Sequence, residues 1–133
     1  MLDLQKSVAD CSAQELVAAL MLQSIGDALN PEQVLRDLYD NQHLWKSFWM
    51  GPLLPLDDGA AEPLMLMFLR DLDQFWHASA FYALAKDKTC VDTLEKLGFQ
   101  WNCDTVRVIS GRQAGRRLGD FENECFLVVY WWD

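Results

Sequence analysis

The segment Glu124-Cys-Phe-Leu-Val-Val-Tyr-Trp-Trp132 ends in seven consecutive side chains that are β-branched, aromatic or leucine. Such side chains favour β-strands because they fill a pleated surface well. Successive side chains of a strand point to opposite faces, so both faces of this strand would be apolar. A strand that is apolar on both faces is typical of the interior of a sheet. The rest of the chain must therefore cover both faces.

A second strand is predicted at Thr105-Val-Arg-Val-Ile-Ser110, where the apolar side chains of Val106 and Val108 alternate with the polar side chains of Thr105 and Arg107. Residues 111–124 contain three glycines and are expected to form a connecting loop. We therefore predict an antiparallel hairpin of strands near 104–110 and 125–132. Because a lone hairpin is marginal in water, helices from the first hundred residues should pack against it.

Two helices are predicted near the amino terminus. Ser12-Ala-Gln-Glu15 fits a capping box, after which the apolar face would comprise Leu16, Ala19, Leu20, Leu22 and Ile25. Asn30 and Pro31 suit the cap and first position of a second helix. Its apolar spacing continues through Leu44, Trp45, Phe48 and Trp49, so we expect this helix to extend until Gly51-Pro52.

The middle of the chain is harder to interpret. Residues 51–62 are rich in proline, glycine and acids and are expected to form a loop. Residues 63–86 have leucine, methionine and aromatic side chains at helical spacing, which favours a long buried helix. A strand at 64–69 followed by a helix at 71–86 is the alternative.

Thr89-Cys-Val-Asp92 resembles another capping box and should start a short helix. Leu94 and Leu97 would face inward, and Gly98 would form the carboxyl-terminal cap. The expected fold class is α+β, with about four helices packed on a small antiparallel sheet that includes the C-terminal β-hairpin. A chain of 133 residues suits one globular domain covering residues 1–133.

Composition limits the class of protein. Hydrophobic residues make up 51% of the chain, which is typical of a globular domain. The start of the chain has no secretory signal pattern, and no apolar run reaches the about 20 residues of a membrane span. We therefore expect a cytoplasmic protein, away from membranes. In that reducing compartment, Cys11, Cys90, Cys103 and Cys125 are expected to be free thiols.

Signatures of catalysis and metal binding are missing from the sequence. His43, His77 and the four cysteines form none of the short spacings typical of zinc ligands. The chain contains neither a Gly-x-Ser-x-Gly elbow nor a Walker-type phosphate loop. We therefore expect no metal, no cofactor and no enzymatic activity. The alternative is a small enzyme that uses Cys125 or Cys90 with His77.

Charge is unevenly distributed. The net charge is −9, and residues 1–73 contain twelve acids but only four basic residues. Such an acidic balance disfavours nucleic-acid binding, which requires clustered lysine and arginine. The acids proposed to contact a partner are Glu32, Asp37, Asp40, Asp57 and Asp58. A secondary candidate is a loop containing Arg107, Arg112, Arg116 and Arg117, since arginine presents a planar fork of donors to anions.

Six tryptophans in 133 residues form the second unusual feature. Tryptophan buries a large area and is enriched at interface hot spots. If Trp45 and Trp49 lie one helical turn apart, their rings project side by side and could anchor a partner.

These features together favour a small acidic protein-binding module. The expected role is inhibitor or neutraliser of a partner protein with a basic surface, in the manner of an immunity protein or a phage-encoded inhibitor of a nucleic-acid enzyme. An acidic chaperone or adaptor subunit is a second alternative, and the sequence leaves a homodimer open.

Overall fold

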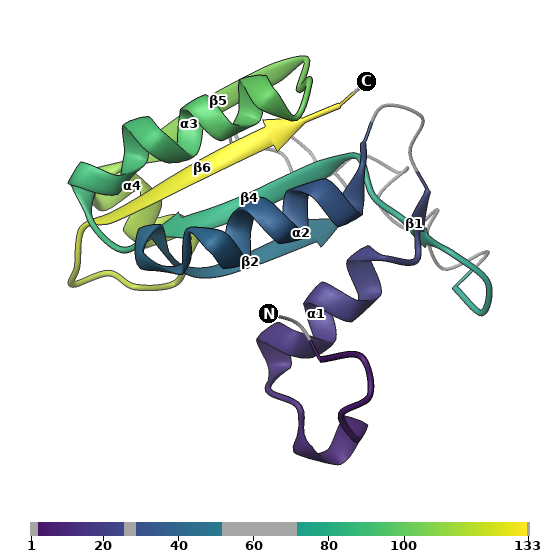
Figure 1. The fold of residues 1–133 in the computed structure, drawn as a ribbon. Coiled ribbons are helices and arrows are strands. Elements are labelled where there is room, and N and C mark those ends of the chain that lie inside the picture. Colours follow the sequence, from purple (N-terminus) through teal and green to yellow (C-terminus); the bar gives the residue numbers. More distant parts are fainter. Residues whose placement is uncertain (1–2, 26–28, 52–71, 133) are drawn as a thin grey trace.

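The computed structural model describes residues 3–25, 29–51 and 72–132. Its main sheet has the strand order β2-β4-β6-β5, and all neighbouring strands are antiparallel (Figure 1). The strands are β2 (Trp45–Gly51), β4 (Ala80–Ala85), β5 (Thr105–Ser110) and β6 (Cys125–Trp131). The helices are α1 (Ala13–Met21), α2 (Pro31–Asp40), α3 (Val91–Gln100) and α4 (Gly111–Arg117). A separate parallel pair joins β1 (Ser24–Ile25) to β3 (Trp76–His77).

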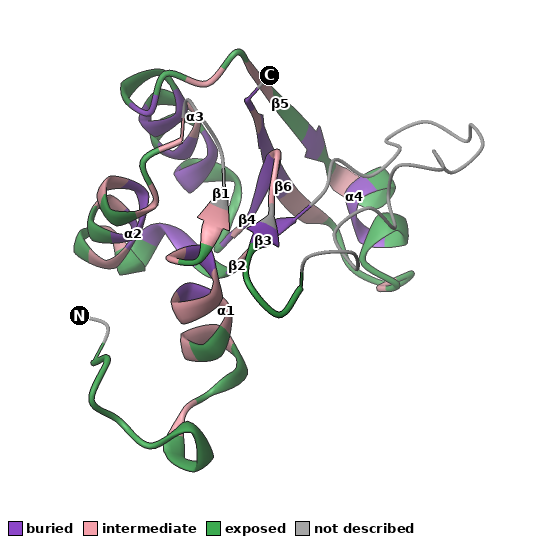
Figure 2. Ribbon diagram, turned by 90° about the vertical axis from the view of Figure 1, so that its right-hand side faces the viewer, coloured by how far each residue is buried: buried purple, intermediate pink, exposed green. Residues whose placement is uncertain are grey.

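Helices lie on both sides of the main sheet. The first three helices lie on one side and α4 lies on the other (Figure 2). The larger core cluster lies between the sheet and the first three helices, and Phe81, Val128 and Tyr130 are fully buried in it. A smaller cluster on the opposite face joins Leu127, Val129 and Ile109 to Ala114 of α4. The predicted α+β class, with helices on a small antiparallel sheet, is confirmed.

The C-terminal segment forms an interior strand, as its two apolar faces predict. β6 lies between β4 and β5, and it pairs with β5 from Thr105–Trp131 to Ser110–Phe126. The predicted pairing of the last two strands is therefore confirmed. Their connection differs from the prediction, because residues 111–117 form α4 rather than loop. Gly115 permits this helix to pack tightly, since a Cβ there would lie 2.6 Å from the carbonyl oxygen of Asp120.

The capping box of α1 is present. The Glu15 amide donates to Ser12 Oγ at 3.1 Å, and the Ser12 amide donates to Glu15 Oε2 at 2.6 Å. The predicted apolar face is wrong, because α1 ends at Met21 and buries Ala18 and Met21 while Leu16 is exposed. α1 packs mainly along β2, so a narrow stripe of two side chains is enough to bury its contact face.

α2 begins as predicted, with Asn30 Oδ1 accepting from the Gln33 amide at 3.1 Å and Pro31 in the first turn. The predicted extension to Trp49 is wrong, because α2 ends at Asp40 and β2 begins at Trp45. A register shift between Trp45 and Ser47 inserts one extra residue into β2. This bulge places Trp45 and Phe48 on the same face, three residues apart, and their spacing therefore imitates that of a helix.

The predicted long helix at 63–86 is wrong where the structure describes it. Residues 76–77 and 80–85 are strands, which also excludes the alternative helix at 71–86. β4 lies between β2 and β6 and is buried almost throughout, so its sequence has no alternation to mark it as a strand. The alternative strand at 64–69 and the predicted loop beyond Gly51 lie outside the described residues.

α3 buries Leu94 and Leu97 as predicted, but both of its predicted ends are wrong. Asp87, not Thr89, caps the 3-10 turn that precedes α3 by accepting from the Thr89 amide at 2.8 Å. Gly98 lies inside the helix, where a Cβ would be 2.6 Å from Val106 Cγ2 and 2.7 Å from Tyr130 Cδ1. Its missing side chain allows α3 to approach β5 and β6 closely.

Candidate functional site

A groove of about 340 Å³ lies beside α2, and we name it the α2 groove. It is lined by the segment before α1, by the residue that follows α1 and by one side of α2. Apolar side chains of Leu4, Leu22, Leu35 and Tyr39 contribute to its lining. Charged side chains complete the lining, from Glu32, Arg36 and Asp40 of α2. Ligand pockets typically have volumes of about 300–1,000 Å³, so this groove lies near the lower end of that range. It suits one or two side chains of a partner.

The helical period of α2 explains why charges line this groove. α2 buries Val34, Leu35 and Leu38 against the core. Glu32, Arg36 and Asp40 recur every four residues, so they form one row along the exposed side of the helix. The groove therefore combines apolar surface with two carboxylates and one guanidinium.

Tyr39 joins the groove to the core. Its ring packs edge-on against Trp45 and Phe48, with centroid distances of 5.9 and 6.2 Å. Burial raises the pKa of Tyr39, and the negative charge of Glu15 raises it further. The phenol therefore stays neutral and is able to donate a hydrogen bond.

An ion pair ties the segment before α1 to that helix. Lys6 Nζ lies 3.0 Å from Glu15 Oε1. The hydrogen bond from the Ser12 amide is the largest cause that lowers the pKa of Glu15, and the hydrogen bond from Lys6 is the second. Glu15 is therefore ionised at neutral pH, and its contact with Lys6 restrains the segment that contributes Leu4 to the groove.

The structure brings together two of the five predicted partner-binding acids. Glu32 and Asp40 both line the α2 groove and are exposed. Asp37 has a structural contact instead, because its Oδ2 accepts from Trp101 Nε1 at 2.8 Å. Asp57 and Asp58 lie outside the described residues. The apolar residues of the groove were not predicted as site residues, and Leu4 has no sequence signal that could have identified it.

The predicted tryptophan pair is wrong. Trp45 is buried, and its Nε1 donates to the Leu38 carbonyl at 2.8 Å, so it belongs to the core. Trp49 lies on the opposite face of β2, where it stacks on Tyr82 with centroids 5.5 Å apart. Because the two side chains point to opposite faces of a strand, they cannot anchor one partner side by side.

The four arginines of the secondary candidate lie on β5 and α4 rather than on a loop. Arg107 is exposed on β5, and Arg112, Arg116 and Arg117 are exposed on α4. α4 and the α2 groove lie on opposite sides of the sheet, so the two charged regions are separate surfaces (Figure 2).

The environments of two cysteines are clear. Cys90 is buried, and its thiol donates to the His43 carbonyl at 3.8 Å. Burial, assisted by the charge of Asp104, raises the pKa of Cys103 to about 12. This shift is opposite to that of an activated cysteine, because the thiolate is the nucleophile. The His77 side chain, proposed as a catalytic partner, lies outside the described residues.

Within the described ranges, no three His, Cys, Asp or Glu side chains are grouped to hold a metal ion. No helix in this part of the chain has the length and apolar character to cross a membrane. Comparisons with protein-family models, curated proteins and solved structures found no match to this chain.

Proposed function

We propose that this chain is a protein-binding module that holds a basic segment of a partner protein in the α2 groove. By occupying that segment, it would inhibit or neutralise the partner. The observation that carries the proposal is the placement of Glu32 and Asp40 beside the apolar residues of one groove. Lysine and arginine have apolar stems and charged ends, so they suit a groove that offers both kinds of contact.

Long-range attraction would assist this binding. Residues 1–73 contain twelve acids and four basic residues, and complementary charge accelerates encounter between proteins. Arg36 lies between the two acids and opposes this attraction locally. The groove would therefore discriminate by the placement of charge as well as by its sign.

The proposal is tested by capturing partners from a lysate of the source organism. The immobilised baits are the natural chain, a variant with Glu32→Lys and Asp40→Lys, and a control with Glu122→Lys and Glu124→Lys. The control makes the same change in net charge at exposed acids between α4 and β6 that do not line the groove. We expect the natural chain and the control to retain a basic protein that the groove variant loses.

Direct titration then measures the affinity for that protein. The groove variant should bind at least about tenfold more weakly, which corresponds to about 1.4 kcal/mol. Leu4→Ala, at a side chain that is 63% exposed, should also weaken binding without affecting the core. Equal retention by all baits, or capture of an acidic protein only, would contradict the proposal.

A further inference from the structure

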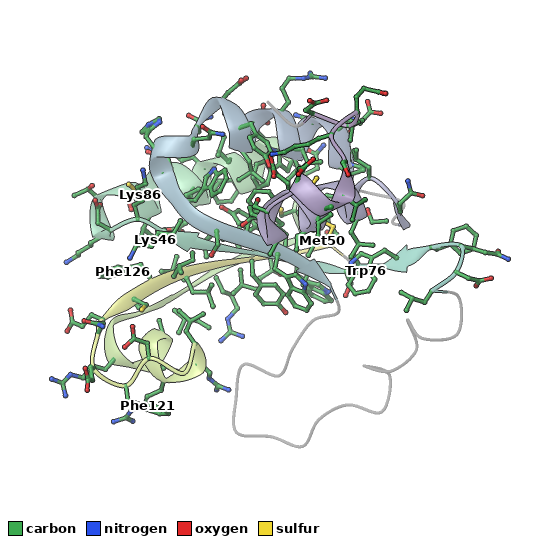
Figure 3. The ribbon with its side chains drawn as sticks, turned by 90° about the horizontal axis from the view of Figure 1, so that it is seen from below. Lys46, Met50, Trp76, Lys86, Phe121 and Phe126 are labelled. Atoms are coloured by element: carbon green, nitrogen blue, oxygen red, sulfur yellow. The ribbon has the colours of Figure 1, made fainter. Side chains whose placement is uncertain are left out.

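The two edges of the sheet differ in how their main-chain groups are paired. β2 and β5 are the outer strands, and an edge strand presents amide and carbonyl groups without partners in the sheet. At β2, side chains occupy both main-chain groups of Phe48 and the carbonyl of Met50. Gln14 Nε2 donates to the Phe48 carbonyl at 2.9 Å, and the Phe48 amide donates to Gln14 Oε1 at 2.8 Å. Trp76 Nε1 donates to the Met50 carbonyl at 2.9 Å (Figure 3).

Strand alternation identifies the outward groups of β5. Trp132 donates its amide to the Ser79 carbonyl, which continues the β4–β6 register, so Tyr130 and Val128 also bond toward β4. The intervening residues of β6 bond toward β5, where their partners include Arg107 and Ile109. The same alternation, carried across β4, turns Phe48 and Met50 of β2 outward, as their side-chain partners require.

Val106 and Val108 therefore direct their amides and carbonyls away from the sheet. Among the residues that the structure describes, no side chain forms a hydrogen bond with either main chain. We name this strip the β5 edge. It offers two donors and two acceptors at the spacing of an added strand.

The charges beside the β5 edge indicate what could pair with it. Arg107 lies on β5 in the same cross-strand row as Val129, Tyr82 and Trp49. α4 begins directly after β5 and adds the exposed Arg112 and Arg116. On the other face, Val108 is 37% exposed. A strand with acids on one face and small apolar side chains on the other would match both.

We propose that the β5 edge binds an extended segment of a partner protein that has acidic side chains at alternate positions. The segment would add to the sheet beside β5, with its main chain bonded to Val106 and Val108 and its acids beside Arg107. Main-chain bonds give affinity in such strand addition, and side chains give selectivity. This surface is separate from the α2 groove and does not depend on the function proposed for it.

Charge disfavours a second copy of this chain as the occupant. Antiparallel pairing of β5 with another β5 places the two copies of Arg107 opposite or diagonal to each other in its central registers. A partner with acidic side chains avoids this contact between two arginines.

The test uses a capped Glu-Val-Glu-Val-Glu-Val-Glu peptide and its analogue with lysine in place of glutamate. Alternation places all the charges on one face of the added strand. Binding to the full chain is followed by amide NMR shifts and by hydrogen exchange. We expect saturable binding of the glutamate peptide, with a Kd at least tenfold lower than that of the lysine peptide. The amides of Val106 and Val108 should become protected from exchange.

Two variants assign the binding to the β5 edge. Val108→Pro removes an outward amide and should abolish binding, whereas Val108→Thr keeps the amide and should bind normally. Arg107→Glu preserves all main-chain groups and should reverse the preference between the two peptides, so the test remains decisive if the proline variant fails to fold.

Three results would overturn the proposal. The glutamate peptide could fail to saturate, or it could protect amides of β2 or α2 instead. Protection of Val106 and Val108 without peptide, lost on dilution, would assign the edge to a second copy of the chain.

Discussion

At the free edge of β2, the side-chain amide of Gln14 forms hydrogen bonds with both main-chain groups of Phe48. A single amide both donates to and accepts from Phe48, which is the pairing that a neighbouring strand would provide. Leaving a buried or half-buried polar group unpaired costs about 1–3 kcal/mol. The pairing of these main-chain groups therefore depends on a residue 34 positions away in sequence.

Replacing Gln14 tests this contact. In Gln14→Glu the donor becomes an oxygen that faces the Phe48 carbonyl, so the free energy of unfolding should fall by about 1–3 kcal/mol. Urea unfolding at pH 7 measures it. Gln113→Glu on the exposed side of α4 is the control for the added charge. Equal stability of the two variants would show that the contact contributes nothing.

Partial burial raises the pKa of the Cys103 thiol. Its pKa is raised from an ordinary value of 9.0 to about 12, so roughly a thousandfold less thiolate is present at pH 8. Iodoacetamide should therefore label Cys103 on the order of a hundredfold more slowly in the native protein than in urea. Peptide mass mapping at timed intervals gives both rates. Similar rates in the two states would refute the assignment.

Helix α3 depends on the small size of one of its residues. Glycine normally weakens a helix interior by about 1 kcal/mol relative to alanine. At Gly98 that order should be reversed, because a Cβ would lie 2.6 Å from Val106 and 2.7 Å from Tyr130. The close approach of α3 to β5 and β6 thus outweighs helix propensity.

We therefore expect Gly98→Ala to lower the free energy of unfolding by about 1–3 kcal/mol through overpacking. Lys96→Ala, at an exposed position of the same helix, should change it by less than about 0.5 kcal/mol. Thermal and urea unfolding of both variants measure the difference. A stabilised Gly98→Ala variant would contradict the packing described for α3.

The elements that the sequence predicted well are those specified by neighbouring residues. The local signals are the capping box of α1, the Asn30-Pro31 start of α2, the alternation along β5 and the β-favouring side chains of β6. β2 was mistaken for helix because its bulge separates Trp45 and Phe48 by three residues. β4 was missed because it is buried on both faces and its alanine and leucine side chains favour helices, unlike the valine and aromatic side chains of β6. α4 was missed because the packing that favours Gly115 involves the chain after the helix.

The candidate site was less predictable than the fold. The acids of α2 were identified from charge alone, which cannot distinguish Glu32 and Asp40 in the groove from Asp37 bonded to Trp101. That distinction needs the tertiary placement of α3 against α2. Leu4 precedes α1 and Leu22 follows it, so both line the groove only because of how α1 is placed beside α2.

Across the molecule, the α2 groove and the arginines of α4 lie on opposite sides of the sheet. The groove has two acids and Arg36 and lies with the first three helices, whereas four other exposed arginines lie on β5 and α4 (Figure 2). The electrostatic attraction that governs encounter with a partner is long-ranged and is screened by salt. Charge changes in the groove should therefore affect association, and apolar changes should affect dissociation.

The most direct measurement is the association rate constant of the captured basic partner at about 0.1 M and about 1 M salt, where the Debye lengths are about 10 and 3 Å. The natural chain should associate more slowly at the higher salt concentration. At the lower concentration, Glu32→Lys with Asp40→Lys should slow association, Arg36→Gln should accelerate it, and the Glu122 and Glu124 control should lie closer to the natural chain. An association rate constant that is unchanged by salt and by all three substitutions in the α2 groove would contradict the proposed role of this groove.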